Sequence, residues 1–151
     1  MPKHWMEGFL KQQKRKKDEE EHQRELDELG KQVTGSMFRH LQEQIESDIK
    51  RFNEERPERA VAFTRVMATR FRLGRSGFPV IGLEVWTEIP GRIDYMTNAQ
   101  AAASLRPLKT EGHILAIAKS RDEMCYRLEG EDLPDESAAA ERLLAPLLST
   151  L

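Results

Sequence analysis

Residues 61 to 89 read VAFTRVMATRFRLGRSGFPVIGLEVWTEI, and this stretch decides the fold. Its apolar side chains alternate with polar ones on both sides of the loop GRSGFP (74–79), which is the pattern of strands that bury one face. The apolar residues all stand at odd positions: Val61, Phe63, Met67, Phe71 and Leu73 before the loop, then Ile81, Leu83, Val85 and Ile89 after it. The stretch therefore predicts an antiparallel hairpin with its odd positions in the core.

The register of this hairpin follows from the same alternation. Pairing odd positions with odd ones keeps each face uniform, whereas a slip of one residue mixes the two faces. We expect Leu73 opposite Ile81 and Phe71 opposite Leu83 in the core, with Arg70 opposite Glu84 and Ala68 opposite Trp86 on the outer face.

A helix precedes the hairpin. Apolar residues recur every three or four positions and end before Pro57: Met37, Phe38, Leu41, Ile45, Ile49 and Phe52. Upstream, Gly30, Thr34 and Gly35 predict a break in the helix, with Ser36 as the N-cap of the segment that follows.

Further strands follow the turn at Pro90-Gly91. A three-residue loop puts Ile93 and Tyr95 in the core but sets Glu88 against Asp94, whereas a two-residue turn stacks Tyr95 on Trp86. Both registers remain open at this point. Alanines 101 to 103 predict a short helix, capped by Asn98 and closed by Pro107.

A second hairpin and a last helix complete the chain. Leu115 and Ile117 alternate on one strand, and Met124, Tyr126 and Leu128 on the next. The acidic turn 134–136 then starts an apolar helix that carries Leu143, Leu144, Leu147, Leu148 and Leu151, with a bend expected at Pro146.

These elements predict an α+β fold, in which a two-layer arrangement covers an antiparallel sheet of about five strands with two amphipathic helices. Residues 36–151 form this domain and residues 1–35 a charged helical extension. The order helix, three strands, short helix, two strands, helix resembles that of the small secretion chaperones. The resemblance covers roughly residues 36 to 151 and implies a dimer that holds a segment of a client protein.

The extension has a polar centre and an apolar end. Residues 11–25 read KQQKRKKDEEEHQRE without one apolar side chain, and each basic residue of Lys14–Lys17 stands four positions before an acidic one. Such spacing predicts a solvated helix with i,i+4 ion pairs. Trp5, Met6, Phe9 and Leu10 precede this block, and a patch of this size must dock on the chain's own domain, on a second copy or on a partner.

Composition narrows the classes of function. The 151 residues suit one domain, and a net charge of −2 provides no global field that would concentrate nucleic acid or an anionic membrane. One cysteine excludes an intramolecular disulfide, and no signal peptide or membrane span is evident, so we expect a cytoplasmic protein.

Three sets of residues bear on a catalytic or metal-binding role: carboxylates, histidines and the single cysteine. Glu84, Glu88 and Asp94 fall on the outer side of neighbouring strands, where paired carboxylates could hold Mg²⁺ for phosphodiester hydrolysis, but the expected lysine two residues after the second carboxylate is missing. The four histidines have no second histidine or cysteine at metal-ligand spacing, and His113 fits a solvated surface position. Cys125 fits a packing role rather than that of a nucleophile.

The sequence therefore favours a non-enzymatic protein–protein interaction module, chaperone-like or adaptor-like, that acts as a homodimer. Its expected contact residues are Trp86, Arg70 and Arg72 on the outer face of the sheet, and Trp5 and Phe9 on the extension. We expect a protein partner or a second copy, and no nucleic acid, membrane, metal or cofactor. The alternatives are a Mg-dependent phosphodiester hydrolase that uses Glu84, Glu88 and Asp94, and a nucleic-acid-associated protein that binds through Lys14–Lys17.

Overall fold

A computed structural model describes the backbone of residues 2–151 and the side chains from residue 5 onward. The chain forms one long helix, α1 (Pro2–Glu55), a short 3-10 turn, η1 (Pro57–Arg59), seven strands and a final helix, α2 (Glu136–Leu148). The strands are β1 (Ala62–Met67), β2 (Arg70–Arg75), β3 (Val80–Trp86), β4 (Arg92–Gln100), β5 (Leu108–Ala118), β6 (Met124–Leu128) and β7 (Glu131–Leu133). All neighbours pair antiparallel in the order of the sequence.

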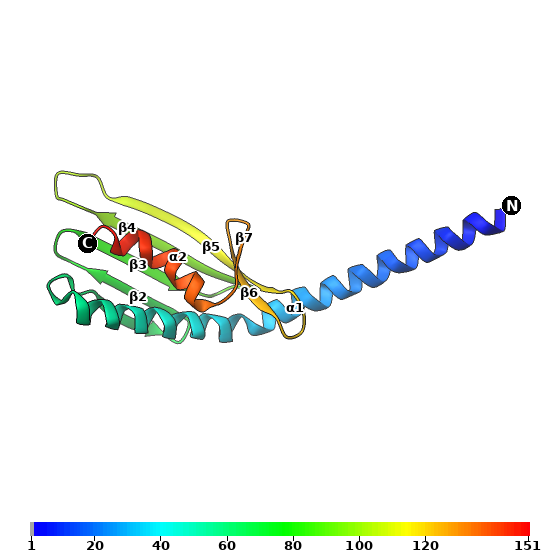
Figure 1. The fold of residues 1–151 in the computed structure, drawn as a ribbon, viewed down its shortest axis with the longest axis horizontal. Coiled ribbons are helices and arrows are strands. Elements are labelled where there is room, and N and C mark those ends of the chain that lie inside the picture. Colours follow the sequence, from blue (N-terminus) through cyan, green and yellow to red (C-terminus); the bar gives the residue numbers. More distant parts are fainter. Residues whose placement is uncertain (1) are drawn as a thin grey trace.

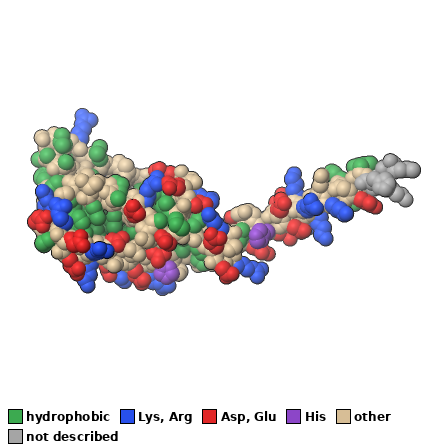
Figure 2. Space-filling view, in the orientation of Figure 1, with side chains coloured by type: hydrophobic (Ala, Val, Ile, Leu, Met, Phe, Trp, Pro, Cys, Tyr) green, Lys and Arg blue, Asp and Glu red, His purple; other side chains and the backbone are tan. Residues whose placement is uncertain are grey.

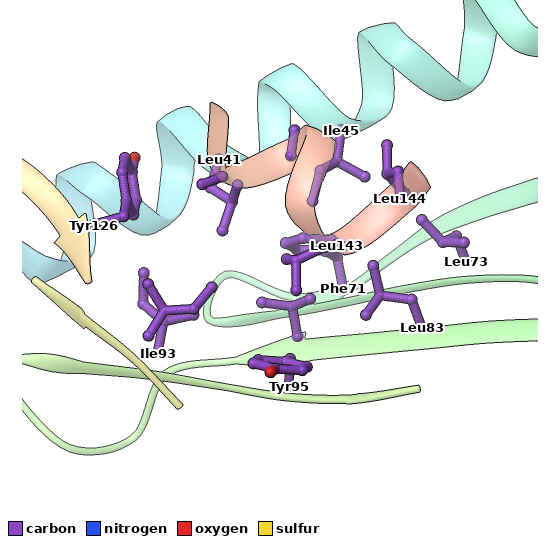
Figure 3. Close-up of a cluster of buried hydrophobic side chains, with 14 of the residues drawn as sticks. Leu41, Ile45, Phe71, Leu73, Leu83, Ile93, Tyr95, Tyr126, Leu143 and Leu144 are labelled. Carbon is purple, nitrogen blue, oxygen red and sulfur yellow. The ribbon is translucent and has the colours of Figure 1, made fainter. Parts of the chain in front are cut away.

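The two helices lie side by side on one face of the sheet (Figure 1). Leu41 and Ile45 of α1 and Leu143 and Leu144 of α2 point at the sheet (Figure 3). They pack on buried sheet residues that include Phe71, Leu73, Leu83, Ile93, Tyr95 and Tyr126. The predicted α+β class is confirmed, as are the core stripe of residues 37–49 and the apolar face of the last helix.

The first correction concerns α1, which continues through Gly30 and Gly35 without the expected break. A Cβ atom at Gly30 would lie 2.7 Å from the carbonyl oxygen of Ala116, so glycine here permits close contact with β5. Thr34 Oγ1 donates to the carbonyl of Gly30 at 2.8 Å and accepts the N–H of Gly91 at 2.7 Å. These residues seat the helix on the sheet, and Ser36 is not an N-cap.

The second correction concerns the strand count, which is seven and not about five. The stretch 61–73 is two strands joined at Ala68-Thr69, and β7 is a short edge strand that the alternation did not reveal. The helix expected at alanines 101–103 is absent, because β4 continues to Gln100 and three alanines are too few to nucleate a helix. The element order that carried the resemblance to secretion chaperones is therefore not the observed one.

The register between β2 and β3 is displaced by two residues from the expected one. Leu73 pairs with Leu83, Phe71 with Val85, Arg72 with Glu84 and Arg70 with Trp86. Both faces stay as predicted, because an even displacement preserves the alternation. β2 extends to Arg75, past the expected start of the loop at Gly74. In the expected register Pro79 would therefore lie opposite Arg75 with no N–H to donate, whereas the observed register leaves Pro79 in the loop.

The facing of β4 and β5 is also settled. Ile93 and Tyr95 lie in the core, as in the three-residue alternative, but Asp94 stands opposite Trp86 and not Glu88. On β5 the expected face was wrong: Ile114, Ala116 and Ala118 are buried and Leu115 is exposed. Small residues are required at 116 and 118 because Gly30 of α1 packs directly on the backbone there. Met67, at the end of β1, and Ile89, in the turn between β3 and β4, were expected in the core but are exposed.

Candidate functional site

The first half of α1 projects beyond the body of the protein (Figure 1). Leu26 is the first buried residue, and every side chain from Trp5 to Glu25 is exposed. At a rise of 1.5 Å per residue, Phe9 stands about 25 Å beyond Leu26 along the helix axis. We call residues 11–25 the shaft and Trp5, Met6, Phe9 and Leu10 the tip.

The tip is an apolar cluster that nothing in the described chain covers. Trp5 is 59 % exposed, Phe9 46 % and Leu10 55 %, and the rings of Trp5 and Phe9 contact each other with centroids 6.0 Å apart. Figure 2 shows apolar side chains at the outer end of the projecting helix, beyond a mixture of charged ones. Of the three docking options left by the sequence, packing of the tip on its own domain is excluded by its position.

The shaft is helical, as predicted, but the predicted i,i+4 ion pairs do not form among its described side chains. Its basic block, Lys14–Lys17, and its acidic block, Asp18–Glu21, are fully solvated, and no ion pair within 4.0 Å forms between them in the described side chains. The nearest polar contact is a hydrogen bond of 2.8 Å from Gln23 to Asp27. The charges of both blocks are therefore available to a partner.

A hollow of about 430 Å³ lies where the shaft meets the body. Leu26 and Leu29 supply its apolar lining, and the rest of the lining is polar or charged: His22, Glu25, Glu28 and Gln32 of α1 and Arg121 of the loop between β5 and β6. The Thr34 hydrogen bond to Gly91 and the contact of Gly30 with β5 lie next along the helix and fix the direction in which the shaft leaves the body. Sequence reasoning missed this hollow, because no pattern within α1 indicates which loop lies beside Leu26.

The outer face of the sheet, away from the helices, carries the second group of predicted residues. The guanidinium of Arg70 lies 5.0 Å from the centre of the Trp86 ring and also binds Glu84 at 2.6 Å and Glu88 at 3.5 Å. Trp86 is therefore half-buried under its own Arg70, whereas Arg72 is exposed beside it on β2. The structure brings Trp86, Arg70 and Arg72 together and leaves Trp5 and Phe9 on the distant tip.

The carboxylates proposed for metal binding are each engaged by a cation. Glu84 and Glu88 share Arg70, while Asp94, only 5 % exposed, lies 2.5 Å from His113 Nδ1 and 2.9 Å from Arg92 Nε. Within residues 5–151 no three His, Cys, Asp or Glu side chains are grouped so that they could hold a metal ion.

His113 is exposed at the surface, as expected, with 59 % of its side chain accessible, but it also has a partner. It binds Asp94 directly across the β4–β5 ladder, and this pairing could not be found without the register of those strands. A carboxylate that orients a histidine provides two of the three members of a catalytic triad, and the third is a nucleophile. The hollow that His113 shares with Trp86, Glu88, Arg92 and Glu111 is lined by no Ser, Thr or Cys, so it lacks the hydroxyl or thiol nucleophile that usually completes such a triad.

Cys125 is buried on the outer side of β6, opposite Ile117 of β5. Burial raises the pKa of its thiol, which favours the unreactive protonated form. Beside it, hydrogen bonds from Arg127 and Lys119 lower the pKa of Asp132 to about 2. This cluster links β5, β6 and β7 and has a structural role.

Comparison with known proteins adds no functional information: no protein family matches the sequence, and no curated protein or solved structure is significantly similar to it. No helix in the described part of the chain is long and apolar enough to cross a membrane. Any functional assignment therefore depends on the surfaces described above.

Proposed function

We propose that this protein is a non-enzymatic protein–protein interaction module that acts as a homodimer in a chaperone-like or adaptor role. One observation carries the proposal: four apolar side chains are exposed at the end of a helix that projects away from the body. Contiguous exposed apolar side chains of this kind mark interaction sites. Full burial of each side chain on a partner is worth about 1.5–3 kcal/mol.

The geometry supports the tip more than the outer sheet face. Trp86 already has a partner in Arg70, and binding a protein there would first have to displace or desolvate an ion-pair network. Trp5 and Phe9 contact only each other among the ring contacts of the described side chains. An amphipathic helix end that enters a groove is a common mode of recognition.

The alternatives from the sequence have less support. Hydrolysis through Glu84, Glu88 and Asp94 would require these carboxylates to leave Arg70, Arg92 and His113. Nucleic-acid binding through Lys14–Lys17 would bring phosphates within one helical turn of the acidic block 18–21.

Capture experiments with the full chain test the proposal. Wild type, a Trp5→Ala/Phe9→Ala variant and a Trp86→Ala variant are immobilised, and protein recovered from an extract of the native source is quantified. Leu105, in the loop between β4 and β5, is 55 % exposed, and Leu108, the first residue of β5, is 73 % exposed. Leu105→Ala/Leu108→Ala is therefore a matched control that removes apolar surface elsewhere.

We expect the tip variant to recover at least about tenfold less of a specific partner, or of a second copy, than the wild type, and the control variant to recover as much as the wild type. Equal recovery by the tip variant and the wild type contradicts the proposal. Binding of the tip to anionic vesicles or to nucleic acid, with no protein partner and no dimer, would replace it.

A further inference from the structure

The two charged blocks of the shaft are complementary to each other in reverse order. Residues 14–17 read KRKK and residues 18–21 read DEEE, so the sign of the charge inverts about a point between Lys17 and Asp18. Within one helix a basic residue four positions before an acidic one is the weaker order for an ion pair. The arrangement is thus not the one that best stabilises an isolated helix.

We propose that two copies of this chain pair through their shafts as antiparallel helices, with a two-fold axis that passes between Lys17 and Asp18. This inference rests on the proposed function and identifies its partner as a second copy. The axis sets Lys14 level with Glu21 of the partner subunit, and the remaining residues of the two blocks pair in the same way, with four levels on each side of the axis. Parallel pairing in register would instead set every charge against its own kind.

The match does not depend on how each helix is rotated about its axis. Successive residues are about 100° apart, so four consecutive residues surround the helix. Whichever side of the shaft faces the partner, a basic block meets an acidic one. Lys11 comes level with Arg24 of the partner subunit, but these two stand on different sides of their helices, about 140° apart, and cannot both lie in the contact.

The same axis brings the apolar ends together. Phe9 comes level with Leu26 of the partner subunit, which lines the hollow at the base of the shaft. Met6 comes level with Leu29 of the partner subunit, but these two stand about 140° apart around their helices and cannot both lie in the contact. Each tip therefore ends beside the hollow of the other copy that Leu26 and Leu29 line, where the shaft meets the body. The contact is the same for both copies and closes at two, so no filament results.

The centre of this interface is entirely charged, which predicts strong dependence on salt. Screening lengths fall from about 10 Å at 0.1 M to about 3 Å at 1 M ionic strength, so added salt should weaken the central contacts most. Only the two apolar ends are unaffected by screening.

Charge reversal in the full chain tests the pairing, with sedimentation equilibrium as the measurement. An all-acidic shaft (K14E/R15E/K16E/K17E) and an all-basic shaft (D18K/E19K/E20K/E21K) should each dimerise at least about tenfold more weakly than the wild type. An equimolar mixture of the two should form a heterodimer. A variant with both blocks exchanged should dimerise as the wild type does, which controls for any loss of helix in the single-sign shafts.

A distance measurement fixes the direction of pairing. Glu7 stands level with Glu28 of the partner subunit in the antiparallel pair, so spin labels at Glu7→Cys, in a Cys125→Ala background, should lie about 30 Å apart. Parallel pairing would bring the labels to about 10 Å and overturn the proposal.

A wild type that stays monomeric at low salt, or single-sign shafts that dimerise as well as the wild type, would also overturn the pairing. If the wild type is monomeric but binds a different protein, and the Trp5→Ala/Phe9→Ala variant loses that protein, the proposed interaction function still stands. If the wild type forms no dimer and binds no other protein through the tip, the proposed function is refuted as well.

Discussion

The contact between Gly30 and β5 gives the sharpest test of the fold, because a second glycine in the same helix serves as its control. A Cβ at Gly30 would lie 2.7 Å from the carbonyl oxygen of Ala116 and 3.8 Å from the amide nitrogen of Ala118. These are backbone atoms and cannot rotate away. A Cβ at Gly35 would meet nothing within 4 Å.

The magnitudes follow from two opposing effects. Replacing a glycine inside a helix by alanine stabilises the helix by about 1 kcal/mol, whereas overpacking a tight contact costs about 1–3 kcal/mol. Gly35→Ala should therefore raise the free energy of unfolding by about 1 kcal/mol, or the Tm by about 2–4 °C for a chain of this size. Gly30→Ala should leave stability unchanged or lower it by up to about 2 kcal/mol.

Urea and thermal unfolding of the full-length variants, followed by circular dichroism, measure both effects. Thr34→Val completes the series, because it leaves the N–H of Gly91 without its partner and should cost about 1–3 kcal/mol. If Gly30→Ala stabilises the protein as much as Gly35→Ala does, α1 does not rest on β5 as described, and the fixed direction of the shaft loses its physical basis.

Three further predictions concern the shaft, the core and pH. Replacing Lys14–Lys17 with alanine should change the free energy of unfolding by less than about 1 kcal/mol, because exposed charges stabilise little; a large loss in a thermal melt would mean that the shaft packs on the body. Leu83→Ala should cost about 2–5 kcal/mol, and Phe52→Ala less, since Phe52 is only half-buried; equal costs in urea titrations would contradict the packing described. Asp132→Asn should lower the Tm near neutral pH. Because the folded pKa of Asp132, about 2, lies below its usual value, the stabilisation is present above pH about 4 and disappears as pH falls towards 2, so the gap in Tm between variant and wild type should close over that range.

Several features could be predicted from residue spacing alone. The alternation of residues 61–89 assigned the buried face of β2 and β3, and the three- and four-residue steps of residues 37–49 assigned the buried stripe of α1. Both succeed because backbone geometry fixes a period of two for a strand and 3.6 for a helix, whatever lies opposite. The exposed, charged character of the shaft and the apolar character of the tip were equally local.

Other features depended on which residues, distant in sequence, lie opposite each other in the folded chain. Taken alone, Gly30 predicts a helix break, but α1 is continuous and lies so close to β5 that only glycine fits at position 30. Ala116 and Ala118 of β5 face α1 for the same reason. The pairing of Asp94 with His113 and the shielding of Trp86 by Arg70 depended on the strand registers. The alternation cannot distinguish between registers that differ by an even number of residues, because each face then stays the same. The sequence determined which side chains are apolar and at what spacing they recur. Only the tertiary structure decided which of them find a partner within the chain, because that depends on atoms distant in sequence that are brought within contact distance, and the tip of α1 is left without such a partner.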